Sequence, residues 1–249
     1  MKTIAMIPAR YAATRFPGKL MQTIGDKTII RHTYENTVAT RLFDEVIVVT
    51  DSKIIFEEII HNGGYALMSR KQHESGSDRI AEAVEDMEVD IILNVQGDEP
   101  FLNKESLREL LNVFNGVDGK KVQVASLMKI IKDPLLINNP NCVKVVVDKN
   151  MNSLLFSRSV IPYLRDAESS AIHYQHIGVY AFRKTALMNF TNWNIGPLEA
   201  AEKIECLRYL ENSIPLKMVL TSFAGIAIDT PDDLQKAEKF YSSQDASSF

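Results

Sequence analysis

The stretch that decides the fold is EVIVVTDSKIIFEEIIHNGGYALM, residues 45–68. Glu45–Thr50 is apolar and β-branched and predicts a buried strand, Lys53–His61 predicts a helix, and Tyr65–Met68 predicts a second strand. Asn62-Gly63-Gly64 closes the helix with the glycine chemistry that helix ends favour. A strand, a helix and a strand in this order predict parallel strands with a helix packed across them.

The same alternation extends in both directions from this stretch. It predicts strands at Thr3–Ile7 and Asp90–Val95, and helices at Ile29–Arg41, Asp78–Met87 and Ser106–Asn115. Alternating strands and helices form a parallel sheet with helices on both faces. The predicted fold class is therefore α/β, with a mostly parallel, Rossmann-like sheet flanked by helices.

After about residue 120 the pattern changes to strands joined by turns. The expected strands are Val122–Ile131, Cys142–Asp148, Asn152–Ser157 and Ile177–Phe182, with a hairpin connection at Asp148–Asn152. These features predict a mixed or antiparallel extension of the sheet.

The last part of the chain returns to the earlier pattern. Helices are expected at Pro197–Glu211 and Pro231–Tyr241, with a strand at Leu216–Ser222 between them and a frayed Ser-rich tail at Ser242–Phe249. We find no repeat and no low-complexity linker, so the 249 residues predict a single domain, 1–249.

Composition and charge exclude several classes of protein. A hydrophobic fraction of 45% and a charged fraction of 24% are those of an ordinary globular protein, and a net charge of −4 argues against a general nucleic-acid binder. Cys142 and Cys206 lack CxxC spacing, which argues against a disulfide framework and a zinc site. No signal peptide and no apolar stretch of about 18 residues is visible, so a cytoplasmic protein without membrane insertion is expected.

The loop after the first predicted strand, PARYAATRFPGK at residues 8–19, carries Arg10, Arg15 and Lys19. Cations on a stiffened loop at the carboxyl end of a parallel strand are typical of polyanion sites in α/β folds. The loop has neither the G-x-x-x-x-G-K-[ST] nor the G-x-G-x-x-G pattern. It therefore predicts a nucleoside triphosphate site of another kind, against the alternative of an ordinary solvated surface loop.

Two aspartates are candidate Mg²⁺ ligands. Asp98, in NVQGDEP, follows a predicted strand and should lie at the same edge of the sheet as the basic loop. Asp229 precedes Thr230-Pro231, which have the residue types of a helix N-cap and first turn and which leave Asp229 itself unexplained. Mg²⁺ often takes one or two carboxylates plus substrate phosphates. The alternative for Asp98 is a turn cap.

Other motifs carry weaker signals. In SRKQHESGSDR, residues 69–79, Ser77 is an expected N-cap, and Arg70 and Arg79 could reach phosphates. The alternative for Arg79 is a pairing with Asp78 or Glu82 on its own helix. Helical spacing places Glu199, Glu202 and Cys206 on one stripe of the Pro197–Glu211 helix, a pattern that is usually a solvated face.

Taken together, the ordered motifs PARYAATRFPGK, HESGSDR, NVQGDEP, NPNCVKVV, FSRSVIP, HIGVYAF, PLEAAEKIECLR and GIAIDTPDDL resemble those of the 3-deoxy-D-manno-octulosonate (Kdo) cytidylyltransferases. The resemblance runs from Ile7 to about Ala237. It implies an α/β nucleotidyltransferase fold like that of nucleotide-diphospho-sugar transferases and an Mg²⁺-dependent transfer of CMP from CTP to Kdo for lipopolysaccharide biosynthesis. It also implies a homodimer built by a subregion at about 125–190.

The resemblance assigns roles by position. Nucleotide contacts fall on Arg10, Arg15, Lys19, Arg70, Ser75, Asp78 and Gln96, with Arg15 also reaching the sugar acid. Asp98 and Asp229 match the Mg²⁺ carboxylates, and the sugar side falls on Arg158, His176, Glu199 and Glu202. Cys206 stands where the family usually has Gln.

Alternatives stay open at this point. A cytidylyltransferase could act on sialic acid or an amino analogue of Kdo. A nucleotide-sugar glycosyltransferase commonly carries D-x-D, which Asp98-Glu99-Pro100 lacks. A non-catalytic nucleotide sensor would not need both aspartates and all three loop cations.

Overall fold

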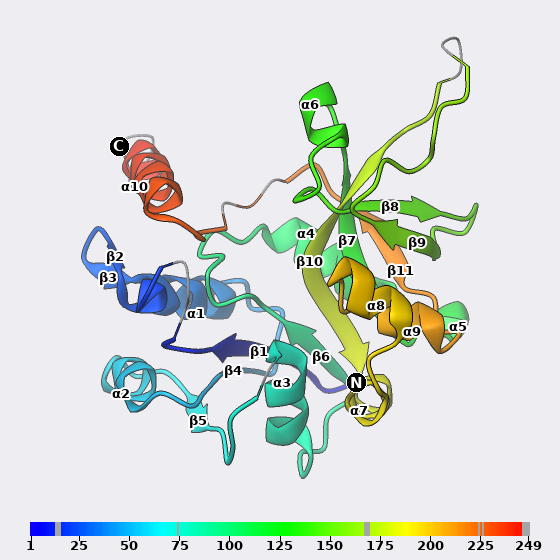
Figure 1. Ribbon diagram of the computed structural model, residues 1–249. Helices are drawn as coiled ribbons and strands as arrows, with labels where there is room; N and C mark the ends of the chain where they lie inside the picture. The colour runs from blue at the N-terminus through cyan, green and yellow to red at the C-terminus, as the bar shows by residue number, and fades with distance from the viewer. Residues whose placement is uncertain (13–15, 74, 167–169, 224, 226, 246–249) are drawn as a thin grey trace. The chain divides into compact units, whose positions relative to one another are not determined.

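The computed structural model describes residues 1–12, 16–73, 75–166, 170–223, 225 and 227–245. They form two compact units: unit 1 is Met1–Lys104 with Gly225–Phe249, and unit 2 is Glu105–Ala224 (Figure 1). The prediction of a single domain stays a prediction, and the expected subregion at 125–190 lies within unit 2.

The strands of unit 1 are parallel. The strand β1 pairs with β4 on one side and β6 on the other, and β4 also pairs with β5. Their bounds are Thr3–Ala9 for β1, Glu45–Thr50 for β4, Ala66–Met68 for β5 and Ile91–Asn94 for β6. Ile4–Ile7 and Ile47–Val49 are fully or almost fully buried, as expected for strands covered on both faces.

The first strand is longer than predicted, because β1 continues through Pro8 to Ala9. The carbonyl of Met6 accepts a hydrogen bond from Val95 N, so this residue and Pro8, two positions on, face the side of β6. The β6 ladder ends at the Met6–Asn94 pair. No strand therefore pairs with β1 on this side at Pro8. Because no ladder hydrogen bond is lost there, the proline is tolerated.

Helices flank the unit 1 strands and begin at well-formed caps. The bounds are α1 Ile29–Ala39, α2 Lys53–His61, α3 Gly76–Val84 and α10 Pro231–Asp245, with the 3-10 turn η1 at Lys19–Met21 and a hairpin of β2 Thr23–Ile24 and β3 Lys27–Thr28. The expected N-cap Ser77 is wrong: Ser75 has the extended backbone of a cap and accepts from Asp78 N, and Ser77 lies inside α3. The expected frayed tail is helical as far as Asp245.

Unit 2 contains the mixed and antiparallel strands that the sequence predicts. The strand β7 pairs in parallel with β11 and antiparallel with β10; β8 pairs antiparallel with β10 and β9. Their bounds are Val124–Ile130 for β7, Lys144–Val147 for β8, Ser153–Ser157 for β9, Tyr174–Arg183 for β10 and Lys217–Leu220 for β11. The hairpin turn at Asp148–Asn152 is confirmed, since Asp148 N donates to the carbonyl of Asn152.

The helices of unit 2 are mostly short. They are α4 Lys104–Asn112, α5 Gly116–Gly119, α6 Pro134–Ile137, α7 Lys184–Asn192, α8 Pro197–Glu202 and α9 Leu207–Glu211. Helices and a mostly parallel sheet together confirm the predicted α/β fold class. In the part of the chain that the structure describes, no helix is long and apolar enough to cross a bilayer.

The helix expected at Pro197–Glu211 is wrong as a single element. Lys203 adopts φ 53 and ψ 47, a left-handed conformation that ends α8 before α9 begins. Helical spacing does not hold across this residue, so Glu199, Glu202 and Cys206 do not share a stripe. Glu199 and Cys206 are buried, which also excludes the solvated face that the sequence favours.

Candidate functional site

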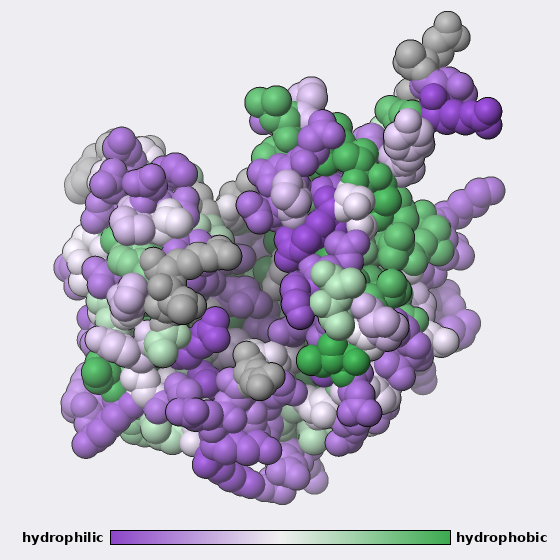
Figure 2. Space-filling model, viewed as in Figure 1, coloured by the Kyte–Doolittle hydropathy of each residue, from purple (hydrophilic) through white to green (hydrophobic). Residues whose placement is uncertain are grey.

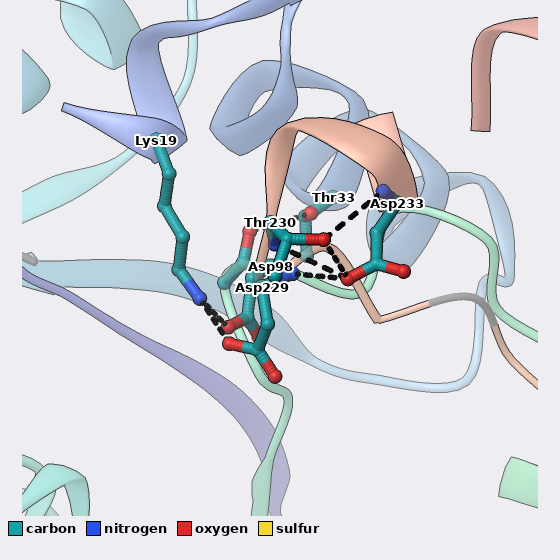
Figure 3. Close-up of polar contacts among 7 residues, drawn as sticks. Lys19, Thr33, Asp98, Asp229, Thr230 and Asp233 are labelled. Carbon is teal, nitrogen blue, oxygen red and sulfur yellow. Dashed lines mark hydrogen bonds and ion pairs between the residues drawn. The ribbon is translucent and has the colours of Figure 1, made fainter. Parts of the chain in front are cut away.

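Lys19, Asp98 and Asp229 come together in unit 1 (Figure 3). The Nζ atom of Lys19 donates to Asp98 Oδ2 at 2.5 Å and to Asp229 Oδ1 at 2.8 Å. The Lys19 side chain is 15% exposed, that of Asp98 24%, and that of Asp229 58%. One ammonium group thus holds two carboxylates that are far apart in the sequence.

The local backbone explains how Lys19 reaches this point. Gly18 adopts φ 64, which glycine tolerates, and its carbonyl accepts from Met21 N as η1 begins. Gly18 N also donates to the carbonyl of Tyr11, whose ring lies 3.4 Å from where a Gly18 Cβ would be. The turn is therefore closed on both sides, and the lysine leaves it in a fixed direction.

Asp98 is held by the close approach of its loop to β1. A Cβ on Gly97 would lie 3.2 Å from the carbonyl oxygen of Pro8, so a side chain there would crowd the backbone. Thr33 Oγ1 donates to the Gly97 carbonyl at 2.9 Å. The Asp98 carbonyl accepts from Ile228 N at 3.0 Å, which ties this loop to the segment that carries Asp229.

Asp229 stands just outside the cap of α10. Asp233 N donates to Thr230 Oγ1, and the Asp233 carboxylate accepts from both Thr230 N and Thr230 Oγ1. The N-cap predicted at Thr230 is confirmed (Figure 3). Because the cap uses Thr230 and Asp233, the Asp229 carboxylate is left to face Lys19.

The negative charge of the two carboxylates exceeds the positive charge of the single lysine. Burial alone would lower the pKa of Lys19, but Asp98 and Asp229 together raise it above its usual value. Burial, together with the charges of Asp98 and Asp229, raises the pKa of neighbouring Glu99 to about 7. The cluster thus favours additional positive charge.

This donor set fits Mg²⁺. Among the described residues no group of three or more His, Cys, Asp or Glu side chains forms a metal cluster. Two carboxylates close enough to share one cation match the way Mg²⁺ is usually held, by one or two carboxylates with substrate phosphates completing its shell.

The other nucleotide-side candidates lie on several segments of unit 1. Arg10 is exposed directly after β1, and Gln96 follows β6. Arg70 is exposed and pairs with Asp86 at 3.3 Å. Ser75 Oγ donates to Asp78 Oδ2 at 2.8 Å within the α3 cap. Arg15 lies outside the described residues.

Arg79 has partners that the sequence reasoning missed. Its guanidinium is buried, donates to Asp51 Oδ2 at 2.8 Å and donates to the carbonyl of Ala9. The expected pairing with Asp78 or Glu82 is therefore wrong. The signal was Asp51, a carboxylate directly after a strand at the same edge of the sheet.

In unit 2, Arg158 and Glu202 contact each other. Glu202 accepts from Arg158 N at 2.9 Å and from Ser157 Oγ at 2.6 Å, while Arg158 Nε donates to the Glu202 carbonyl at 2.7 Å. Buried Lys144 donates to the Arg158 carbonyl at 2.5 Å. The two predicted sugar-side residues thus belong to one polar network.

Glu199 and His176 occupy separate places in unit 2. Glu199 forms a buried bidentate ion pair with Arg208, with two N–O distances of 2.6 Å. His176 lies edge-on to Phe156, its Nε2 is 2.9 Å from Ser126 Oγ, and burial lowers its pKa to about 4. Their assignment to the sugar side stays a prediction.

The parallel sheet, the lysine turn and the paired carboxylates define a nucleotide-using α/β enzyme. A model of the cytidylyltransferase family matches residues 4–218. The 3-deoxy-manno-octulosonate cytidylyltransferase of Flavobacterium johnsoniae is 58% identical over 95% of this chain and 97% of its own length, and that of Christiangramia forsetii is 56% identical over 97% of both. This chain belongs to the family of 3-deoxy-manno-octulosonate cytidylyltransferases.

A solved structure agrees. The structure of CMP:2-keto-3-deoxy-manno-octonic acid synthetase complexed with CTP superposes with a TM-score of 0.92 at 36% identity, covering 98% of this chain and all of that one. The family resemblance predicted from the motifs is confirmed.

Proposed function

We propose that this protein transfers CMP from CTP to the anomeric hydroxyl of Kdo and releases pyrophosphate. The observation that carries the proposal is the joint hold of Lys19 on Asp98 and Asp229 in a chain of this family. A polyanionic substrate and a divalent cation both suit this arrangement, because the lysine offers positive charge to phosphates and the aspartates offer hard oxygen ligands.

The residues of the site act by position and charge. Lys19 keeps its proton because its pKa is raised, so it offers a permanent positive charge to the phosphates, and Arg10 adds a second one. Such groups stabilise charge that develops on the transferring phosphoryl group and the departing pyrophosphate. When bound by Asp98 and Asp229, Mg²⁺ would supply Lewis-acid stabilisation and orientation.

The acceptor is a sugar acid, so a guanidinium should meet its carboxylate. Arg15 and Arg158 are the proposed partners, because a planar guanidinium binds a carboxylate with two parallel hydrogen bonds. His176, Glu199 and Glu202 complete the proposed sugar side. In the cell, CMP-Kdo would serve lipopolysaccharide biosynthesis.

We also propose a cytoplasmic homodimer. Both cysteines are free thiols, which suits a reducing compartment. Large apolar side chains are exposed within residues 125–190, and Figure 2 shows hydrophobic surface over α6 and along β8 and β9. These exposed residues are Ile130, Leu135, Leu154, Leu155, Tyr163, Leu164 and Ile172. Apolar surface gathered in this way marks interaction sites.

The decisive assay measures pyrophosphate release from each of the four nucleoside triphosphates, with Kdo, amino-Kdo or sialic acid, with and without Mg²⁺. We expect release from CTP with Kdo in the presence of Mg²⁺. Release with sialic acid or amino-Kdo alone would change the acceptor, and release of a nucleoside mono- or diphosphate would favour a glycosyltransferase. No pyrophosphate under any combination would contradict the proposal.

Substitutions test the site itself. Asp98→Ala and Asp229→Ala should each lower turnover by at least about a hundredfold, the scale of losing a charge-stabilising group. Lys19→Ala should raise the CTP concentration needed for half-maximal rate. Asp232→Ala is the matched control, because this carboxylate is close in sequence and exposed. Near-normal turnover of an Asp98 or Asp229 variant would remove that residue from the metal site.

A further inference from the structure

The C-terminal helix α10 carries Asp229 at its start and an apolar face near its end. Leu234, Ala237, Phe240 and Tyr241 recur at the three- and four-residue spacing that places side chains on one side of a helix. Ala237 is fully buried. In Figure 1, α10 lies beside α1 and the β2–β3 hairpin of the same unit. This face therefore fastens the helix to unit 1.

Two aromatic contacts make that attachment specific. The ring of Phe240 meets Phe101 edge to face, with 4.8 Å between ring centroids. The ring of Tyr241 meets His32 in the same way at 5.2 Å. Tyr241 also lies against Gly25, where a Cβ would come within 3.0 Å of Tyr241 Cε1. Such edge-to-face pairs prefer a defined geometry in addition to burying area.

Both contacts end on parts of the chain that hold Asp98. Phe101 lies three residues after Asp98 and is 8% exposed. His32 precedes Thr33, whose hydroxyl donates to the Gly97 carbonyl at 2.9 Å. One ring therefore packs on the loop of the first carboxylate, and the other packs on the helix that fixes this loop.

The other end of α10 controls Asp229. The helix begins at Pro231, and hydrogen bonds between Thr230 and Asp233 cap it. Asp229 directly precedes this cap, so its backbone is joined to the start of the helix. A shift of α10 would thus move Asp229, whose side chain is 58% exposed and so receives little packing of its own. The hydrogen bond from Ile228 N to the Asp98 carbonyl joins the two carboxylate segments at the backbone, and the seating of α10 is a second restraint on Asp229.

We propose that Phe240 and Tyr241 are positioning residues that hold Asp229 opposite Asp98 so that the two carboxylates bind one divalent cation with CTP. This inference rests on the proposed function, since it assigns a supporting role at the same site. Neither ring touches the reacting atoms. Their effect is on the affinity for the cation. Groups that hydrogen-bond to metal ligands typically change metal affinity or activity by about 10- to 100-fold, and we expect these more distant rings to act at the lower end of that range.

The test measures Mn²⁺ binding by electron paramagnetic resonance in the presence of CTP and absence of Kdo, together with kcat and the Mg²⁺ concentration for half-maximal rate. Phe240→Ala and Tyr241→Ala should weaken Mn²⁺ binding and raise the Mg²⁺ requirement by about tenfold or more. The ring-retaining variants Phe240→Tyr and Tyr241→Phe should restore wild-type affinity. Lys239→Ala, exposed on the same helix, is the control and should behave like the wild type.

Folding is checked separately by thermal unfolding and by hydrogen exchange of the α10 amides. Should Phe240→Ala fail to fold, Phe240→Leu and Phe101→Leu keep apolar volume while removing the ring pair, and each should still weaken Mn²⁺ binding. Folded variants without the ring pair that bind Mn²⁺ like the wild type would overturn the proposal. Failure of the wild type to release pyrophosphate would instead count against the proposed function, because the Mn²⁺ and CTP titration does not depend on turnover.

Discussion

At the residue scale, the site is defined by an imbalance of charge. One ammonium group, that of Lys19, faces the carboxylates of Asp98 and Asp229, while Glu99 beside them has its pKa raised to about 7. A carboxyl group that resists ionisation reports a local excess of negative charge and poor access of water. A divalent cation would relieve that excess, because it brings two positive charges and can take carboxylate and phosphate oxygens into one shell.

His176 should make the stability of the protein depend on pH. Burial lowers its pKa to about 4 in the folded state, against about 6.5 in the unfolded chain. Between these values the unfolded chain binds a proton that the folded protein does not, so stability falls as the pH is lowered from 6.5 to 4. The loss approaches about 3 kcal/mol at the acid end.

Urea unfolding at pH 7.5 and at pH 4.5 measures this effect, and His176→Asn is the matched variant. The variant should lose less stability on acidification than the wild type does. An equal loss in the two proteins would show that other groups cause the acid sensitivity.

The positions of single site residues could be predicted where the residues follow a predicted strand or precede a predicted helix cap. Asp98 and Lys19 lie in loops that follow predicted parallel strands, whose carboxyl ends meet at one edge of the sheet. Asp229 directly precedes a predicted helix N-cap. Arg79 was not predictable in the same way. Its partners lie 28 and 70 residues away, and the local spacing rule favours neighbours on its own helix. A buried cation takes the partners that the tertiary fold supplies.

At the element scale, the break between α8 and α9 offers a sharp test. Lys203 is exposed and adopts φ 53, a conformation that costs a residue with a Cβ roughly 1–2 kcal/mol and glycine much less. Lys203→Gly should therefore raise the free energy of unfolding by up to about 1 kcal/mol, and Lys203→Val should lower it. The hydrogen bond from residue 203 N to the Glu199 carbonyl, 2.8 Å, is available to all three residues.

The measurement is the urea midpoint of each variant at pH 7.5. Replacement of the neighbouring exposed Ala201 by Ser serves as a control for a mild change in helix propensity. A clear loss of stability in Lys203→Gly would mean that the lysine side chain itself supports the break.

Elements were predictable where local preference and burial agree. Glu45–Thr50 and Lys53–His61 have the bounds that the sequence predicts. The strand is rich in β-branched residues, and the serine that caps the helix marks where the helix begins. Pro197–Glu211 contains good helix formers throughout, so its local pattern gives no sign of a break. The break accompanies two contacts outside the spacing of a continuous helix, the Glu199–Arg208 ion pair across the break and the long-range hydrogen bond from Ser157 to Glu202.

At the scale of the whole molecule, the chain returns to its first unit to complete the site. Asp229 lies 210 residues after Lys19, and only the closing segment Gly225–Phe249 places it in unit 1. Composition and periodicity predict strands and helices but contain no information on such a long-range pairing. The ordered motifs of the family predict that Asp98 and Asp229 act together, and both carboxylates do contact Lys19. Their role as Mg²⁺ ligands stays a prediction.

The exposed apolar surface of unit 2 predicts self-association. Leu135 and Tyr163 are 81% exposed and Leu154 is 61% exposed, and leaving such side chains in water forgoes about 25 cal/mol for each Å² that a partner could cover. We therefore expect the protein to sediment at about twice the 28.1 kDa of one chain. Leu154→Asp and Tyr163→Ser should shift it towards the monomer, since each places polar groups in the expected interface.

Ile54→Ser, a similarly exposed apolar position in unit 1, is the control and should not change the mass. A wild-type protein that sediments as a single chain at micromolar concentration would contradict the expected dimer, and dissociation by Ile54→Ser alone would move the interface to unit 1.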